Sequence, residues 1–273
     1  MRLGRLSYVN CYPVYGAIDR GIVAAPATLV SGTPTELNDR LADGRLDVSV
    51  ISAVAYAQHP DAFALLPDLA VSSDGPVRSV LLFSRRPPEE LSGARVLVST
   101  SSRTSVLLLD LLARDRWGAS FTTAAAPTEP GDLSRLADVP HDAVLVIGDA
   151  ALLLGAGGTY PHVTDLGEAW KAWTGLPFVF AVWAARRDAA AEAVSEVHSA
   201  LLASRRWGLA HLDELAAQAA ERTGVGTETC RAYLSGLDYG LSYRHLAGLA
   251  DFLRRLAAQG LVPDGSLRFV SAA

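Results

Sequence analysis

Residues 31–52 read SGTPTELNDRLADGRLDVSVIS, and this stretch decides the fold. A helix is expected to begin here, because Thr33 can cap its first free amides and Glu36, three residues later, completes a capping box. Gly44 fits the left-handed position that often follows a helix. Residues 46–51 are then mostly apolar and short, which is typical of a buried strand. The stretch predicts a short amphipathic helix that leads into a core strand.

Two further units repeat this arrangement. Residues 94–99 predict a strand that passes through the polar turn 100–103 into a helix over 104–117. Residues 143–147 predict another strand, followed by the turn Gly148-Asp149 and a short helix from Ala150. Strands that alternate with amphipathic helices form parallel sheets covered by helices. The chain is therefore expected to be an α/β protein.

The last third of the chain is dominated by helical patterns, over residues 189–207, 212–223 and 243–259. In the last of these, four leucines follow helical spacing: Leu246, Leu249, Leu253 and Leu256. A stripe of this kind faces a core more often than a partner. We interpret these segments as packing helices.

A length of 273 residues is near twice that of a usual domain, which favours two lobes. The strand-like runs at 77–84 and 177–183 are well placed to cross from one lobe to the other and back. This interpretation assigns residues 1–82 and 183–273 to a discontinuous lobe one. Residues 83–182 then form lobe two.

Composition excludes several classes of function. Half of the residues are hydrophobic and 19% are charged, as in a well-packed globule, and a formal charge of −5 offers no basic surface for nucleic acid. No apolar stretch reaches the roughly 18 residues of a membrane span, and the first residues do not resemble a signal peptide, so we expect a cytoplasmic protein without membrane contact.

Familiar motifs of catalysis and metal binding are missing from the sequence. The two cysteines, Cys11 and Cys230, and the six histidines have no metal-ligand spacing, so no metal is predicted. There is no GxSxG elbow, GxGxxG fingerprint or P-loop, which disfavours hydrolase, dehydrogenase and nucleoside-triphosphatase functions.

Polar side chains follow the predicted strands, where ligands of such sheets gather. The turn at residues 100–105 offers hydroxyls and an arginine at a helix N-terminus, which suits an anion, although a plain helix cap has the same residues.

Asp149 can cap a helix, orient a ligand hydroxyl or act as a base. Asn10, at the end of the first expected strand, is either a turn residue or a hydrogen-bonding group for a ligand. Ser79, in an expected crossing strand, needs a partner if it is buried. The residues alone predict a cleft that suits a small carboxylate.

Seven stretches stand out by their order and spacing: SYVNCYP at 7–13, GTPTEL at 32–37, LDVSVIS at 46–52, DGPVRSV at 74–80, SSRTS at 101–105, IGD at 147–149 and WTGLPFVFA at 173–181. Together they resemble the chorismate dehydratases of the futalosine route to menaquinone. The resemblance implies a two-lobed, periplasmic-binding-protein-like (type II) fold with a ligand cleft between the lobes.

The resemblance also implies an activity. Chorismate would lose water to give 3-[(1-carboxyvinyl)oxy]benzoate, with no metal or organic cofactor, so a carbon–oxygen hydro-lyase is expected. Asn10 and Ser79 match the motifs of the family that would position the hydroxyl and the carboxylates. The expected substrate-binding residues are Ser52, Ser102, Arg103, Thr104, Ser105, Gly148, Asp149, Pro177 and Phe178. No matched motif contains a histidine, so the substrate's own enolpyruvyl carboxylate is one hypothesis for the base.

Two other functions compete with this one. The same lobes serve non-catalytic binding proteins for small carboxylates, against which the lack of an export signal counts. The sister enzyme of the same pathway, which releases a dihydroxynaphthoate, has an opening that resembles Ser-Pro-Cys-Pro-Asn-Asp, whereas residues 7–13 here read SYVNCYP. The sequence leaves the oligomeric state open.

Overall fold

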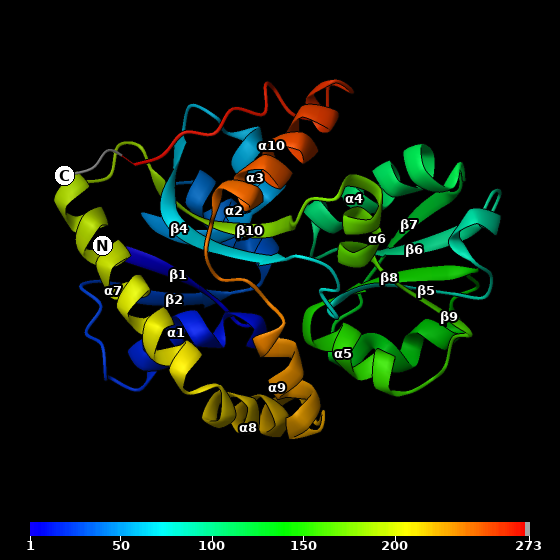
Figure 1. Cartoon of the computed structure of the whole chain (residues 1–273), viewed down its shortest axis with the longest axis horizontal. Coiled ribbons are helices and arrows are strands. Elements are labelled where there is room, and N and C mark those ends of the chain that lie inside the picture. Colours follow the sequence, from blue (N-terminus) through cyan, green and yellow to red (C-terminus); the bar gives the residue numbers. More distant parts are fainter. Residues whose placement is uncertain (271–273) are drawn as a thin grey trace.

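The computed structural model describes residues 1–270, apart from the side chain of Ala137, and contains two five-stranded sheets. The first sheet has the strand order β2-β1-β3-β10-β4 (Figure 1). β1 runs parallel to β2 and β3, whereas β10 is antiparallel to β3 and β4. Its strands are β1 (Arg2–Leu6), β2 (Thr28–Gly32), β3 (Val48–Ser52), β4 (Phe63–Ser73) and β10 (Phe178–Arg186).

The second sheet has the order β7-β6-β8-β5-β9. β6 is parallel to β7 and β8, and β5 is antiparallel to β8 and β9. Its strands are β5 (Val80–Ser84), β6 (Arg95–Ser99), β7 (Thr122–Ala126), β8 (Ala143–Ile147) and β9 (His162–Asp165). The chain is thus a mixed α/β protein, as the sequence predicts.

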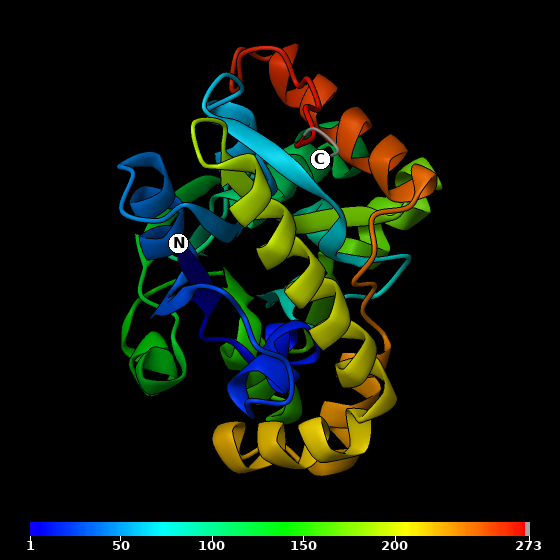
Figure 2. The same cartoon turned by 90° about the vertical axis from the view of Figure 1, so that its left-hand side faces the viewer.

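Helices cover both faces of each sheet. On the first sheet α3 and α10 lie on one face and α1 and α7 on the other, while α4 and α6 lie opposite α5 on the second sheet (Figure 1). Figure 2 shows α7 running diagonally across the first sheet, with α8 and α9 at its lower end. The helices are α1 (Tyr12–Asp19), α2 (Pro34–Ala42), α3 (Ala53–Gln58), α4 (Arg103–Leu112), α5 (Gly148–Ala156), α6 (Leu166–Thr174), α7 (Ala191–Ala210), α8 (Leu212–Thr223), α9 (Thr227–Ser235) and α10 (Tyr243–Ala257).

The stretch that decides the fold behaves as predicted. The Thr33 hydroxyl accepts a hydrogen bond from the amide of Glu36, and the Glu36 carboxylate accepts one from the amide of Thr33 at 2.9 Å. Gly44 is left-handed, with φ of 72°, and all five residues of β3 are buried. Local capping and strand burial therefore agree with the global fold.

Three local features differ from the expected elements. The first strand ends at Leu6, so Asn10 lies in a 3₁₀ turn, Val9–Cys11, instead of at a strand end. Gly148 is the first residue of α5, with φ of 62°. The helix after β6 is regular only as far as Leu112, and Ala113–Trp117 continues as a wider π turn.

The chain passes between the sheets twice. The first crossing is residues 74–79, between β4 and β5, and the second crossing is residues 175–177, between α6 and β10. The expected lobe boundaries at 82 and 183 fall inside β5 and β10, because an apolar run marks the strand and the crossing lies just before it. We propose residues 74–79 and 175–177 as the boundaries between the lobes.

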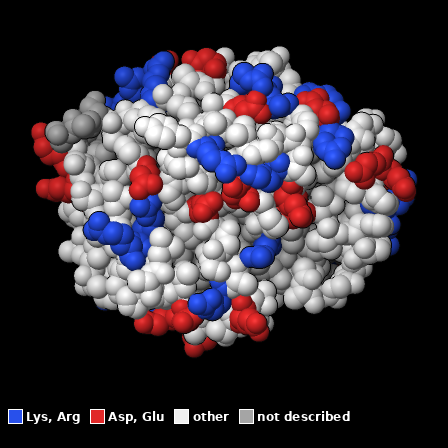
Figure 3. Space-filling view, in the orientation of Figure 1, with Lys and Arg blue, Asp and Glu red and all other residues white. Residues whose placement is uncertain are grey.

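Acidic and basic side chains are interspersed on the face shown in Figure 3. Among residues 1–270, no helix is both long and apolar enough to cross a membrane.

Candidate functional site

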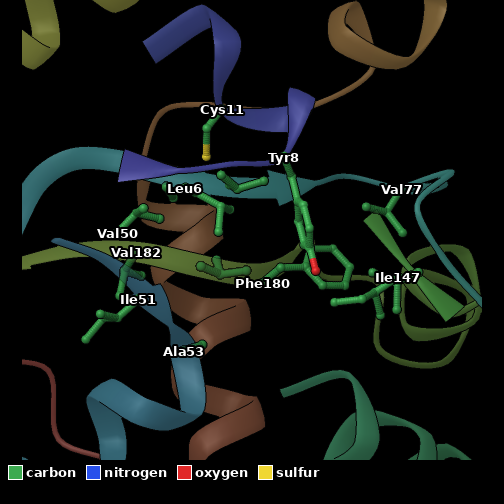
Figure 4. Close-up of a cluster of buried hydrophobic side chains, with 14 of the residues drawn as sticks. Leu6, Tyr8, Cys11, Val50, Ile51, Ala53, Val77, Ile147, Phe180 and Val182 are labelled. Atoms are coloured by element: carbon green, nitrogen blue, oxygen red, sulfur yellow. The ribbon is translucent and has the colours of Figure 1, made fainter. Parts of the chain in front are cut away.

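A cavity of about 70 Å³ lies between the two sheets. Figure 4 shows the side chains of Tyr8, Ile147 and Phe180 lying near one another; they come from the turn after β1, from β8 and from β10. Most of the wall is apolar, and the polar members lie at a strand end, in turns or at the N-terminus of α4. The lining residues are Leu6, Tyr8, Asn10, Pro34, Val50, Ile51, Ser52, Val71, Val77, Ser79, Val80, Ser102, Ser105, Ile147, Gly148, Phe180 and Ala181. We call this space the inner cavity.

A second cavity of about 330 Å³ shares Ser52 and Ser102 with the inner cavity, and we call it the outer cavity. Most of its lining residues have polar side chains, His59 and Arg103 among them. With the Gln58 amide turned so that its oxygen accepts, the Arg103 guanidinium lies 3.2 Å from that oxygen. Together the two cavities form a cleft with an apolar inner end and a polar mouth.

Asn10 reaches the inner cavity from the 3₁₀ turn after β1. Its Oδ1 atom is buried and has no hydrogen-bond partner among the described residues. A buried acceptor without a partner costs about 1–3 kcal/mol. A ligand that donates a hydrogen bond would recover this cost, so Asn10 has the properties of a binding group.

Ser79 lies in the first crossing, just before β5, instead of inside a strand. The preceding Arg78 has a left-handed φ of 61°, and the Asp165 carboxylate holds this turn by accepting from the amides of Val77 at 3.0 Å and Arg78 at 2.6 Å. Burial raises the pKa of Asp165 above its usual value. The Ser79 hydroxyl accepts a hydrogen bond from the Tyr233 hydroxyl at 2.8 Å.

The N-terminus of α4 also faces the inner cavity. Ser102 caps this helix by accepting from the amide of Ser105 at 3.2 Å, and its hydroxyl lies 2.8 Å from that of Ser105. The first backbone N–H groups of a helix have no partner within it, so this end suits an anion. Thr104 turns the other way, because its Oγ1 accepts from the amide of Val54, at 3.1 Å, in the helix after β3.

Asp149, an expected ligand contact, lines neither cavity in the described part of the chain. It is 5% exposed, accepts from the amide of Val9 at 3.1 Å and lies 3.5 Å from Arg222. Burial raises the pKa of its carboxyl above the usual value. Asp149 therefore holds the turn that carries Asn10 from the opposite side of the cleft.

Pro177 and Phe178 also lie away from both cavities. Phe178 is 1% exposed and packs against the rings of Trp170 and Phe252, whose centroids lie 5.3 and 4.8 Å from its own. Phe180 and Ala181 line the inner cavity instead, where the pairing of β10 with β4 shifts register between Val179 and Ala181.

The sequence did not single out Tyr8, which lines the inner cavity, or Glu129, which Tyr8 contacts. The Tyr8 hydroxyl donates to Glu129 Oε1 at 2.8 Å, and the Ser101 hydroxyl donates to the same oxygen at 2.7 Å. Tyr8 belongs to the half of the molecule built on the first sheet, whereas Glu129 and Ser101 belong to the other. Motif 7–13 gave a signal for Tyr8, but nothing near Glu129 did. This contact closes the cleft at one side.

Comparisons with known proteins show which family the chain resembles. A family model described as menaquinone biosynthesis matches residues 1–258. The chain is 36% identical to the chorismate dehydratase of Thermus thermophilus, over 84% of this chain and 86% of that protein. It is 27% identical to the 1,4-dihydroxy-6-naphtoate synthase of Streptomyces coelicolor, over 92% and 90% of the two chains.

Among solved structures, the periplasmic aliphatic sulphonate binding protein of Escherichia coli matches all of this chain and 94% of its own, with a TM-score of 0.68 and 14% identity. The fold is thus periplasmic-binding-protein-like, as expected. Since the family model covers most of the sequence, and the Thermus relative is more than 30% identical, the chain belongs to the menaquinone biosynthesis family.

Proposed function

We propose that this protein is a chorismate dehydratase, a hydro-lyase that converts chorismate to 3-[(1-carboxyvinyl)oxy]benzoate and water. The identity to the Thermus chorismate dehydratase supports the substrate. The observation that carries the proposal is the unpartnered, buried Oδ1 of Asn10, in a cavity that also contains Ser79 and the N-terminus of α4. A hydroxyl acid with an apolar ring complements this combination. A cytoplasmic location is part of the proposal.

The proposed reaction is an elimination within the ring. The C–H bond beside the enolpyruvyl ether breaks, and its electron pair delocalises into the ring carboxylate. The neighbouring C–O bond then breaks, the oxygen leaves with a proton as water, and the ring becomes aromatic. The protein must orient the ring and supply hydrogen-bond donors to the carboxylate as charge develops on it.

The N-terminus of α4, with Ser102 and Ser105, would bind a carboxylate. Asn10 would accept a hydrogen bond from the ring hydroxyl, and Ser79 would donate one to the substrate. The residues that line the inner cavity in the described chain include no histidine. We propose that the enolpyruvyl carboxylate of the substrate takes the ring proton.

Incubation of the purified, chelator-treated protein with chorismate tests the proposal, with the product followed by mass. Loss of one water, with formation of the enolpyruvyl benzoate, supports it. Intact chorismate contradicts it. Binding of chorismate without turnover would then favour a binding protein, and turnover of the cyclised futalosine derivative would favour the sister enzyme.

A further inference from the structure

Tyr233, on α9, makes a buried contact with Ser79. The two hydroxyl oxygens lie 2.8 Å apart, and Tyr233 is 1% exposed. Burial raises the pKa of Tyr233 above its usual value, so the phenol keeps its proton and can donate it. Neither the helical pattern of the last third nor any motif in the sequence pointed to this residue.

The direction of this hydrogen bond matters for Ser79. A serine hydroxyl has a single proton and can accept through two lone pairs. Among residues 1–270, the other hydrogen-bond partner of the Ser79 hydroxyl is the carbonyl of Val77, to which the serine donates at 3.5 Å, a distance too long for a strong bond. With one lone pair engaged by Tyr233, the serine proton is free to point into the inner cavity, which Ser79 lines.

The backbone on both sides of this contact is also tied together. The Arg78 guanidinium donates to the carbonyl of Ala232 at 2.6 Å, next to Tyr233 in α9. Asp165 fixes the amides of Val77 and Arg78 from the second sheet. Because these bonds flank the pair, α9 and the first crossing hold the two hydroxyls in one arrangement.

We propose that Tyr233 is a positioning residue that engages Ser79 as an acceptor and so directs the serine proton toward the substrate. The proposal rests on the proposed function, because it gives Ser79 its role as a donor to chorismate. Tyr233 itself does not line the inner cavity and acts only through Ser79.

Tyr233→Phe tests the proposal, because it removes the donor while keeping the ring. Loss of one oriented hydrogen bond should lower kcat on the order of tenfold and leave KM nearly unchanged. Tyr239→Phe is the matched control, since the Tyr239 hydroxyl is also buried but has no partner among the described residues. This control should keep the wild-type kcat. A Tyr233→Phe enzyme with the wild-type kcat would overturn the proposal.

A double-mutant cycle separates positioning from a general effect on packing. In a Ser79→Ala background, Tyr233→Phe should cause no further loss of kcat, because the residue through which it acts is gone. An equal loss in both backgrounds would show that Tyr233 acts independently of Ser79, and the proposal would be wrong.

The same four proteins, without ligand, give a measurement that does not need turnover. If the hydroxyls are coupled, the two single changes and the double change should shift Tm non-additively; additive shifts would overturn the proposal. Failure of the wild-type protein to convert chorismate would instead contradict the proposed function, and the stability cycle would still report on the contact.

Discussion

Two asparagines differ in whether the side-chain oxygen has a hydrogen-bond partner within the protein. The Oδ1 atom of Asn38 accepts a hydrogen bond from the amide of Ser52 at 3.1 Å, so this side chain stabilises the fold. Asn10 has the same side chain, but its buried Oδ1 has no partner among the described residues. A folded protein keeps such a group at a cost in stability when function requires it.

Asn10→Leu should therefore stabilise the unliganded protein while abolishing its activity. The change removes an unsatisfied acceptor and keeps the branching and the number of side-chain heavy atoms, so the free energy of unfolding should rise by about 1 kcal/mol. Turnover of chorismate should fall at least a hundredfold. Urea unfolding and a mass assay measure both. Asn38→Leu is the control and should lower stability, whereas a loss of stability in Asn10→Leu would argue against a ligand-binding role.

Gly148 combines a left-handed backbone with a close contact across the cleft. A Cβ atom at this position would lie 2.9 Å from Cδ2 of Tyr8, and φ is 62°. Gly148→Ala should cost about 1–2 kcal/mol from the backbone alone, and more from the displaced tyrosine. Gly155→Ala, in the same helix, should stabilise the protein slightly, because its nearest neighbour, Leu81, would lie 3.6 Å away. Thermal unfolding tests both, and equal Tm values would contradict this account.

At the scale of elements, the helices and strands that could be predicted are those determined by residues close together in the sequence. The capping box at Thr33 and Glu36 and the strand 143–147 could be predicted because neighbouring residues determine them. The contacts of Tyr8 and Asp149 could not, because each joins residues more than a hundred positions apart. The expected roles of Asn10 and Ser79 remain predictions, although both line the inner cavity.

The turn that carries Asn10 is held by Asp149, and this contact has a pH signature. Because burial raises the pKa of Asp149 in the folded protein, the folded state binds the proton more tightly than the unfolded state. The charged carboxylate therefore reduces stability at pH 7, and this penalty disappears below the unfolded pKa of about 3.9. Asp149→Asn should raise the free energy of unfolding at pH 7 and change it little near pH 3.5.

Asp47→Asn is the control with the opposite sign. A hydrogen bond from Arg2 lowers the pKa of Asp47, so its charge contributes stability above the unfolded pKa that is lost as the pH falls. This change should lower stability at pH 7, as measured by urea unfolding.

Asp149→Asn should also retain turnover. Near-complete loss of turnover with normal chorismate binding would contradict a base supplied by the substrate.

At the scale of the whole molecule, the inner end of the cleft is narrow. The inner cavity of about 70 Å³ is smaller than the roughly 300–1,000 Å³ of most ligand sites. The Tyr8–Glu129 contact joins the two halves, and two short crossings connect them. Rotation about residues 74–79 and 175–177 would open the cleft for a substrate.

Small-angle scattering can detect this rotation. The unliganded protein should have a larger radius of gyration than the protein saturated with the proposed product, because the ligand favours the closed state. Tyr8→Phe should reduce the difference by weakening closure. Identical radii with and without ligand would count against a large opening, and the substrate would then enter through side-chain movement alone.

The position of β10 in the first sheet also bears on how the protein is made. β10 lies between β3 and β4, yet it follows every strand of the second sheet in the chain. On a ribosome, β3 and β4 emerge early and have no common partner until β10 has been synthesised. The second sheet can pair fully before then. The half of the molecule that begins first is therefore completed last, and the edges of β3 and β4 that pair with β10 stay unpaired for much of the synthesis of the chain.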